Sequence, residues 1–423
     1  MPAVCLHLQA HIPERLVGFN VFNESDRYFD ADANRAYTRW IAGRAFVPAL
    51  GLLQDNIERT RGDFRIGLSL SGLTALALQQ HAPQALSILN LLTATGEVEF
   101  TAQTQAHSLS GLVDATEFAR QIESHCAMVE QCFGQRPSLF CNTESIYSDG
   151  IGAAAADHAH RFLGVLASAP GVDPTSTYRC GVRPELTVMV RHGPLSDTLT
   201  QGFAHDRQGG PLTADGFAAR VAEVEGELVN LFLDLELFGA QHWSSSGILR
   251  FLDRLPRALL DRGCYFVTPA EALDAVDGGT LLRQPIPQAG TVSRDPDTRP
   301  GTTAWLGNMM QRSAAQRVFG LAGRVRGAAA SGDHAALLRD WVRLTASDHL
   351  LFMNTQVPLE LSRPRLVSPY DSPYDAYINI MNIVDHLESR LPEVSDLPDA
   401  TSREPRAVAS RPALGPVCEE PLP

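Results

Sequence analysis

The chain has 423 residues, of which 44% are hydrophobic and 20% charged, and its formal net charge at pH 7 is -13. This length and hydrophobic content predict a large folded unit of enzyme size rather than a disordered chain. The excess of acidic residues argues against a nucleic acid or an anionic membrane surface as the main partner. Every basic residue is Arg, which excludes a Schiff-base lysine, pyridoxal-phosphate attachment and a phosphate-loop lysine.

The cysteine spacing and the first residues bear on metal sites, disulfides and targeting segments. The seven cysteines form no CxxC pair, so neither a disulfide framework nor a zinc ribbon is indicated. The start, MPAVCLHLQAHIPERL, lacks the basic stretch and apolar core of a signal peptide, and no apolar run reaches the length of a membrane span. We therefore expect a cytoplasmic protein with no membrane segment.

Short apolar runs alternate with helical patterns over roughly the first two thirds of the chain. Runs typical of strands occur at 3–9, 64–70, 97–102, 138–142, 162–167, 186–191, 229–237 and 265–269. Apolar residues at helical spacing fill 117–133 and 246–263, and the second pattern stops at Gly263. The alternation predicts a mostly parallel sheet, open or closed into a barrel, and the number of units favours a barrel.

The last third has a different character. Residues 280–303 are rich in Gly, Pro and Asp and predict a linker. Helical patterns follow at 304–328, 333–353 and 372–391. In SPYDSPYD (368–375) the second Ser-Pro predicts a helix start with Pro373 at the first helical position. The tail beyond 392 has few large apolar residues and is expected to be disordered.

The segment LFLDLELFGAQHW (231–243) places two carboxylates in an apolar run. Residues two apart on a strand share a face, so Asp234 and Glu236 would lie on one side of an interior element. Proteins pair, neutralise or use buried carboxylates, because an unpaired ionised one is costly.

Other polar side chains also fall in or just after the predicted strands. They are His7, Gln9, His11, Glu97, Glu99, Gln103, His107 and Glu144. In a parallel barrel, reacting groups gather at the carboxyl ends of strands. Two carboxylates from different strands can cleave a glycosidic bond. The two carboxyl groups lie about 5–5.5 Å apart in retaining enzymes and about 6.5–9.5 Å apart in inverting ones. Each carboxylate taken singly is better explained as a salt-bridge or strand-end residue than as a catalyst. Tyr147, Phe238 and Trp243 could stack on sugar rings or belong to the core.

Metal binding is the main competing interpretation. DHAH (157–160) and the His7/His11 pair could donate to a divalent ion, but no HExxH motif occurs. GLSLSG (67–72) has neither the GxSxG spacing of a nucleophile elbow nor a dinucleotide fingerprint.

Several collinear segments together resemble glycoside hydrolase family 57, in particular its α-amylase-type members. They are LQAHIP (8–13), GEVEFTAQTQAHSL (96–109), FCNTESIYSD (140–149), NLFLDLELFGAQHW (230–243) and TASDHLLFM (345–353). The resemblance covers most of residues 1–390, and such long ordered motifs are more specific than a single short pattern.

The resemblance implies an incomplete seven-stranded (β/α) barrel over 1–285, a helical C-terminal domain over 286–391 that completes the active site, and a disordered tail over 392–423. It implies retaining cleavage or transfer at α-1,4-glucosidic bonds of an α-glucan or malto-oligosaccharide, without a metal or other cofactor. Glu144 would be the nucleophile and Asp234 the general acid/base. The substrate-binding residues would be His11, Glu99, His107, Glu236, His242, Trp243 and Asp348.

The sequence departs from the family pattern at five of the motif positions. Ile12 and Gln103 stand where the family has Gln and Glu, Cys141 where it has Arg, Leu235 where it has Tyr, and Ala240 where it has Glu. These changes leave both predicted catalytic carboxylates in place. Three alternatives remain at this point: a 4-α-glucanotransferase, a catalytically weak glucan-binding relative, and a metal-dependent sugar deacetylase.

Overall fold

The computed structural model describes residues 1–20, 22, 25–157, 162–169, 171–203, 212–277, 283–285, 302–330, 334–356 and 368–392. Within these ranges no helix has both the length and the apolar content needed to cross a membrane. The predicted linker lies mostly outside these ranges, and the predicted tail lies almost wholly outside them. The proposed domain limits therefore stay predictions.

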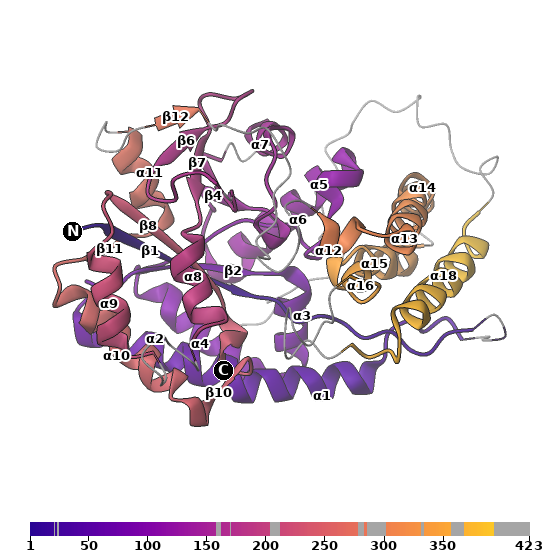
Figure 1. Ribbon diagram of the computed structural model, residues 1–423. Helices are drawn as coiled ribbons and strands as arrows, with labels where there is room; N and C mark the ends of the chain where they lie inside the picture. The colour runs from indigo at the N-terminus through magenta and orange to yellow at the C-terminus, as the bar shows by residue number, and fades with distance from the viewer. Residues whose placement is uncertain are drawn as a thin grey trace.

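Two groups of parallel strands form the barrel (Figure 1). In the first, β1 (Ala3–Ala10) lies between β2 (Ile66–Leu70) and β8 (Leu228–Asp234), and β2 pairs with β3 (Val98–Phe100). In the second, β5 (Gly164–Ala167) lies between β4 (Leu139–Cys141) and β7 (Thr187–Val190). All of these pairings are parallel, as the alternation with helices predicts.

Single bridges join the two groups. Ala102, just after β3, forms a parallel bridge with Phe140 of β4, and Arg191, just after β7, forms one with Asn230 of β8. Within the described residues, seven parallel strands thus follow chain order around the barrel, with their ladders interrupted at these two places. The predicted incomplete seven-stranded (β/α) barrel is confirmed.

Smaller strands extend the framework. β11 (Tyr265–Phe266) pairs with Ala3 and Val4 at the start of β1. β6 (Thr177–Arg179), which the sequence analysis missed, runs antiparallel to β7, and β12 (Arg283–Pro285) pairs with β6. Beyond the barrel strands, β9 (Phe238–Gly239) and β10 (His242–Trp243) form a separate small pair.

Helices surround the strands on the outside of the barrel (Figure 1). They are α1 (Ala31–Ile41), α2 (Val47–Thr60), α3 (Gly72–His81), α4 (Pro83–Ala94), α5 (Ser110–Val113), α6 (Ala115–Phe133), α7 (Asp149–Ala156), α8 (Gly193–Thr200), α9 (Ala214–Ala222), α10 (Ile248–Leu260) and α11 (Pro269–Asp277). α6 shows why such segments are helical: the Asp114 side chain accepts from the Glu117 N–H at its start, and Gly134 ends it in a left-handed conformation.

The C-terminal helices form a second cluster beside the barrel, coloured orange and yellow in Figure 1. They are α12 (Thr303–Leu306), α13 (Met309–Gly320), α14 (Ala322–Ala330), α15 (Ala335–Leu344), α16 (Ser347–Leu351) and α18 (Pro373–Ser389). Their buried residues, Trp305 and Trp341 among them, belong to the same hydrophobic cluster as Phe140 and Val188 of the barrel. Pro373 occupies the first turn of α18 after the Ser372 cap, as predicted.

The predicted strand that contains Asp234 and Glu236 is longer than the observed one, and the difference changes how these two side chains are placed. The run 229–237 predicts a single strand, but β8 ends at Asp234, and Leu235–Leu237 form a 3-10 turn. Asp234 and Glu236 therefore do not share a strand face. They stand at the end of the strand and on the turn that follows it, where both are partly exposed.

Candidate active site

A pocket opens where β1 and β8 end, and its wall also includes residues of α1 and α16. Its lining residues are Gln9, His11, Pro13, Tyr37, Trp40, Ile41, His107, Asp234, Glu236, Ala240, Gln241 and Asp348. Five of the predicted site residues, His11, His107, Asp234, Glu236 and Asp348, therefore meet in one place. Their positions at or beyond strand ends agree with the usual location of barrel active sites.

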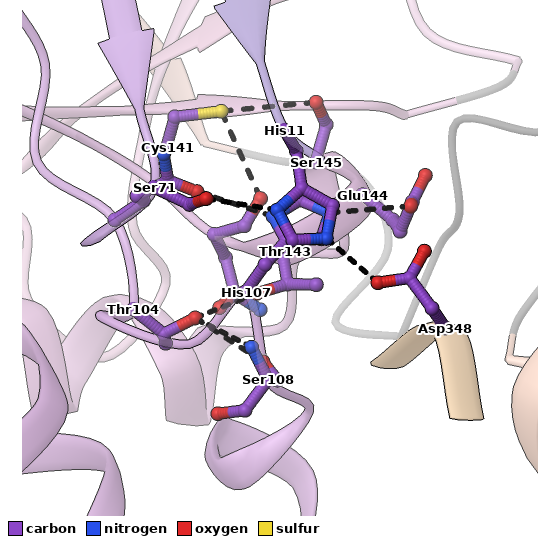
Figure 2. Close-up of polar contacts among 12 residues, drawn as sticks. His11, Ser71, Thr104, His107, Ser108, Cys141, Thr143, Glu144, Ser145 and Asp348 are labelled. Atoms are coloured by element: carbon purple, nitrogen blue, oxygen red, sulfur yellow. Dashed lines mark hydrogen bonds and ion pairs between the residues drawn. The ribbon is translucent and has the colours of Figure 1, made fainter. Parts of the chain in front are cut away.

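Glu144 lies next to this pocket, on the turn Thr143–Ser145 that follows β4. Its backbone is left-handed, with φ 58° and ψ 22°, a conformation that residues other than glycine seldom adopt. Thr143 helps to hold the turn, because its hydroxyl lies 2.8 Å from that of Thr104 in the loop after β3. The Glu144 side chain is buried, and its Oε1 lies 3.3 Å from Nε2 of His107 (Figure 2).

His107 connects Glu144 to the pocket. It is also left-handed, with φ 52°, and its Nδ1 lies 3.1 Å from Oε1 of Gln103. Burial, followed by the neighbouring His11, lowers the pKa of His107, and the bond to Glu144 opposes this. An amide can turn either its oxygen or its NH2 group towards Nδ1, so Gln103 suits either neutral tautomer of His107. A carboxylate here, as in the family pattern, would suit only an N–H at Nδ1.

His11 is held by a chain of hydrogen bonds from α3. The Ile12 N–H donates to Oγ1 of Thr74 at 2.7 Å, and the Thr74 and Ser71 hydroxyls are 2.9 Å apart. Ser71 Oγ then lies 2.8 Å from Nδ1 of His11, and Nε2 of His11 lies 2.6 Å from Oδ2 of Asp348 (Figure 2). With Asp348 ionised and His11 neutral, Nε2 carries the proton and the Ser71 hydroxyl donates to Nδ1.

The two histidines and the acidic turn form one connected unit. The rings of His11 and His107 stack with centroids 4.1 Å apart. Oε1 of Glu236 accepts from the backbone N–H of His11 at 3.2 Å. Asp234 therefore faces the pocket, while Glu236 both faces it and is tied to the chain just after β1.

Three predicted substrate-binding residues are not in the pocket wall. Glu99 accepts from Ser138 Oγ at 2.5 Å and from the Ala270 N–H at 2.6 Å, so it ties β3 to the chain before β4 and to α11. His242 donates from Nε2 to the Leu199 carbonyl oxygen at 3.0 Å. Trp243 is 45% exposed beside the pocket. Both carboxylate oxygens of Glu99 thus bind the scaffold, and its substrate role stays a prediction.

Several lining residues were missed from the sequence. Tyr37, Trp40 and Ile41 come from α1, and no strand-end rule points to a helix. Gln241 belongs to the segment after β8, where the only signal was the departure from the family pattern. Ser71, behind the pocket wall, belongs to the segment GLSLSG, and its contact with His11 depends on the fold.

The competing metal site gains no support from the part of the chain that is described. There, no group of three or more His, Cys, Asp and Glu side chains is arranged to hold a metal ion. His158 and His160 lie outside the described residues. His7 is buried in β1, and burial lowers its pKa to about 4.

A (β/α) barrel with acidic side chains around a pocket at its strand ends, completed by a helix from a C-terminal cluster, has the arrangement of an enzyme active site. The chain belongs to glycosyl hydrolase family 57, whose model matches residues 6–283. It is accordingly a glycoside hydrolase or a related transglycosylase.

Three relatives illustrate the similarity. A curated protein of Methanocaldococcus jannaschii named "Putative alpha-amylase" is 27% identical over 405 residues, which cover 92% of this chain and 85% of that protein. A GH57-type branching enzyme from Pyrococcus horikoshii superposes with a TM-score of 0.63 at 13% identity, covering 93% of each chain. A 4-alpha-glucanotransferase from Thermococcus litoralis gives 0.64 at 11% identity, covering 91% of this chain and 60% of that one. The two solved structures support the fold alone.

Proposed function

We propose that this protein is a retaining enzyme that acts on α-1,4-glucosidic bonds of α-glucans and malto-oligosaccharides. Glu144 is the nucleophile and Asp234 the general acid/base. Membership of family 57 supports the reaction type. The name of its curated relative, "Putative alpha-amylase", supports the substrate class.

One observation carries the assignment. Asp234 lines the pocket together with His107, and His107 in turn lies within hydrogen-bond distance of Glu144. A carboxylate that follows β4 thus lies next to the pocket that the carboxylate at the end of β8 lines, and two carboxylates from different strands are what glycosidic cleavage of this kind uses.

The reaction then proceeds in two balanced steps. A Glu144 carboxylate oxygen bonds to the anomeric carbon while the bond to the leaving oxygen breaks and Asp234 gives that oxygen its proton. Asp234, now ionised, takes a proton from water or from the hydroxyl of an acceptor sugar. The resulting oxygen nucleophile bonds to the anomeric carbon and releases Glu144 as the free carboxylate.

The remaining side chains of the pocket bind and orient the sugar. His11 and His107 present their rings at the pocket wall, while protein partners lie within hydrogen-bond distance of all four of their ring nitrogens. Glu236 and Asp348 offer carboxylate oxygens that accept from sugar hydroxyls. None of these four needs to form a bond to carbon.

Product analysis after incubation with maltoheptaose tests the proposal and separates the two reaction outcomes. Shorter sugars alone indicate hydrolysis, whereas a ladder of both shorter and longer sugars indicates transfer. Glu144→Gln and Asp234→Asn should each abolish turnover without altering the circular dichroism spectrum. Full activity in either variant would overturn the assignment. Binding of maltodextrin without any turnover by the unaltered protein would favour the glucan-binding alternative.

A further inference from the structure

The loop that carries His107, residues 104–108 between β3 and α5, is bound by a side chain of α6. Oε1 of Gln121 accepts from the Ala106 N–H at 3.2 Å and from the Ser108 hydroxyl at 2.9 Å. The residue on each side of His107 is thus bound to the same amide oxygen. All five residues of this segment, here called the His107 loop, are buried, so water cannot replace a hydrogen bond lost there.

The nitrogen of the same amide binds groups on the other side of α6. Nε2 of Gln121 donates to Oγ1 of Thr345 at 3.0 Å and to Oε1 of Glu117 at 3.2 Å. Oε2 of Glu117 in turn lies 3.1 Å from Nη1 of Arg326 in α14. The Ala106 N–H can only donate and the Glu117 carboxylate can only accept, so a single orientation of the amide satisfies both.

The loop also reaches the C-terminal helices through its own backbone. The His107 carbonyl oxygen accepts from the Ser347 N–H at 3.0 Å, and Ser108 forms an antiparallel bridge with Ala346. Ser347 is the first residue of α16, and the next residue, Asp348, lines the pocket together with His107. The contact between the loop and the helix therefore places two pocket residues relative to each other.

The inner side of the loop faces the turn that carries the proposed nucleophile (Figure 2). Thr104, at the start of the loop, contacts Thr143 through its hydroxyl, and the His107 ring lies 3.3 Å from Glu144. The backbone of His107 is left-handed, with φ 52°. A residue other than glycine keeps this conformation only where surrounding contacts fix it, and the bonds from Gln121 to its two neighbours are such contacts.

We propose that Gln121 is a positioning residue of the active site, whose amide holds His107 against Glu144. The inference rests on the proposed function. Gln121 is buried and is not one of the described residues that line the pocket, so it acts on the reaction through the His107 loop and not by touching the sugar. Without the amide, two buried donors of the loop lose their acceptor, and the loop relaxes away from the nucleophile.

Steady-state kinetics with maltoheptaose test the inference. Gln121→Leu has neither donor nor acceptor, and we expect its kcat to fall about ten-fold or more while its KM changes less than about three-fold. The loss belongs in kcat because His107 faces the attacking carboxylate. A merely structural role would lower the melting temperature and leave the kcat of the folded protein unchanged. If Gln121→Leu does not fold, Ser108→Ala, which removes one donor to Oε1, takes its place, and its kcat should fall about three-fold or more.

A conservative exchange and a matched control complete the design. In the double variant Glu117→Gln, Gln121→Glu, an oxygen at position 121 still accepts from the loop and an amide at position 117 donates to it, so kcat should recover to within about three-fold of the unaltered protein. Gln135→Leu is the control. Gln135 follows α6, where its Oε1 accepts from the Phe100 N–H at 2.8 Å and its Nε2 donates to the Val98 carbonyl oxygen at 2.7 Å, so it also joins backbone groups but does not contact the loop. Its kcat should be unchanged.

Three results would overturn this inference alone. They are a kcat of folded Gln121→Leu, or of Ser108→Ala in its place, within about two-fold of the unaltered protein, an equal loss of kcat in Gln135→Leu, and no recovery in the exchange variant. If the unaltered protein does not turn over maltoheptaose, the proposed function fails and the role of Gln121 fails with it.

Discussion

The Nε2 atom of His11 lies 2.6 Å from Oδ2 of Asp348, which joins the end of the first barrel strand to helix α16 of the C-terminal cluster. Both side chains are buried and both line the pocket. The barrel alone therefore forms only part of the pocket wall, and the helical cluster supplies an acidic group that also fixes the protonated nitrogen of His11.

Replacing Asp348 tests this relationship. Asp348→Ala leaves the His11 N–H without its acceptor, and we expect kcat/KM on maltoheptaose to fall by about ten-fold or more. Asp348→Asn keeps an oxygen that can accept this hydrogen bond, so its kcat/KM should fall less than that of Asp348→Ala. Steady-state kinetics on the three proteins, with thermal melts to confirm folding, provide the measurement. Equal activity of all three would contradict a role for this pair.

The hydroxyl chain behind His11 gives a second prediction. Ser71→Ala removes the hydroxyl that faces Nδ1, so His11 with its proton on Nε2 loses a hydrogen bond, and the pH profile of kcat/KM should change as well as its maximum. Ser196→Ala is the matched control, because it also removes a buried hydroxyl, one that accepts from the Phe232 N–H at 3.2 Å, away from His11. If the two variants lose activity equally with unchanged pH profiles, the role assigned to Ser71 is wrong.

The backbone at Gly239, in the segment after β8, packs directly against the π-helical turn Ala42–Phe46, and this contact leads to a prediction about stability. Gly239→Ala places a methyl group against the Arg44 carbonyl and forces a positive φ on alanine, at a cost of about 2 kcal/mol or more. Gly43→Ala is the control on the facing turn, since nothing lies within 4 Å of the Cβ it would add. In urea unfolding, the free energy of unfolding should be clearly lower for Gly239→Ala and little changed for Gly43→Ala. Similar unfolding midpoints would argue against the packing described.

The burial of His125 leads to a prediction about how the free energy of unfolding depends on pH. Its Nε2 donates to the Leu70 carbonyl oxygen at 2.8 Å, and burial lowers its pKa from the ordinary 6.5 to about 4. Between these values the unfolded chain binds a proton that the folded protein does not. The free energy of unfolding therefore falls as the pH falls through this window, by about 1.4 kcal/mol per pH unit for this residue.

Above pH 6.5 His125 contributes no pH dependence, because it is neutral in both states. Comparison of urea unfolding at pH 7 and pH 5 for the unaltered protein and His125→Gln isolates its share. From pH 7 to pH 5 the free energy of unfolding of the variant should fall by about 2 kcal/mol less than that of the unaltered protein. An identical loss in both proteins would show that His125 is not held neutral by the fold.

Much of the fold could be predicted from the sequence because parallel strands buried on both faces give apolar runs of characteristic length. The limits of such runs are less well determined. Leu235 and Leu237 continue the apolar pattern of β8 although the chain has already turned, so the pattern alone placed Asp234 and Glu236 on one strand face. The location of the protein in the cytoplasm stays a prediction.

The candidate site was only partly predictable for a related reason. Glu144, Asp234, His11, His107 and Asp348 stand in long motifs, and the fold brings them together or into one hydrogen-bonded group. Glu99 stands in such a motif as well, but its partners Ser138 and Ala270 come from distant segments. The π-helical turn Ala42–Phe46 after α1 has no periodic signal in the sequence either.

The central claim is that Glu144 attacks the anomeric carbon. Incubation with an α-configured 5-fluoro glucosyl fluoride, which slows the second step, followed by protease digestion and mass spectrometry, tests it most directly. We predict a glycosyl adduct on the peptide that contains Glu144, and none in Glu144→Gln. An adduct on Asp234 or Glu236, or turnover to a product of inverted configuration with no adduct, would contradict the account.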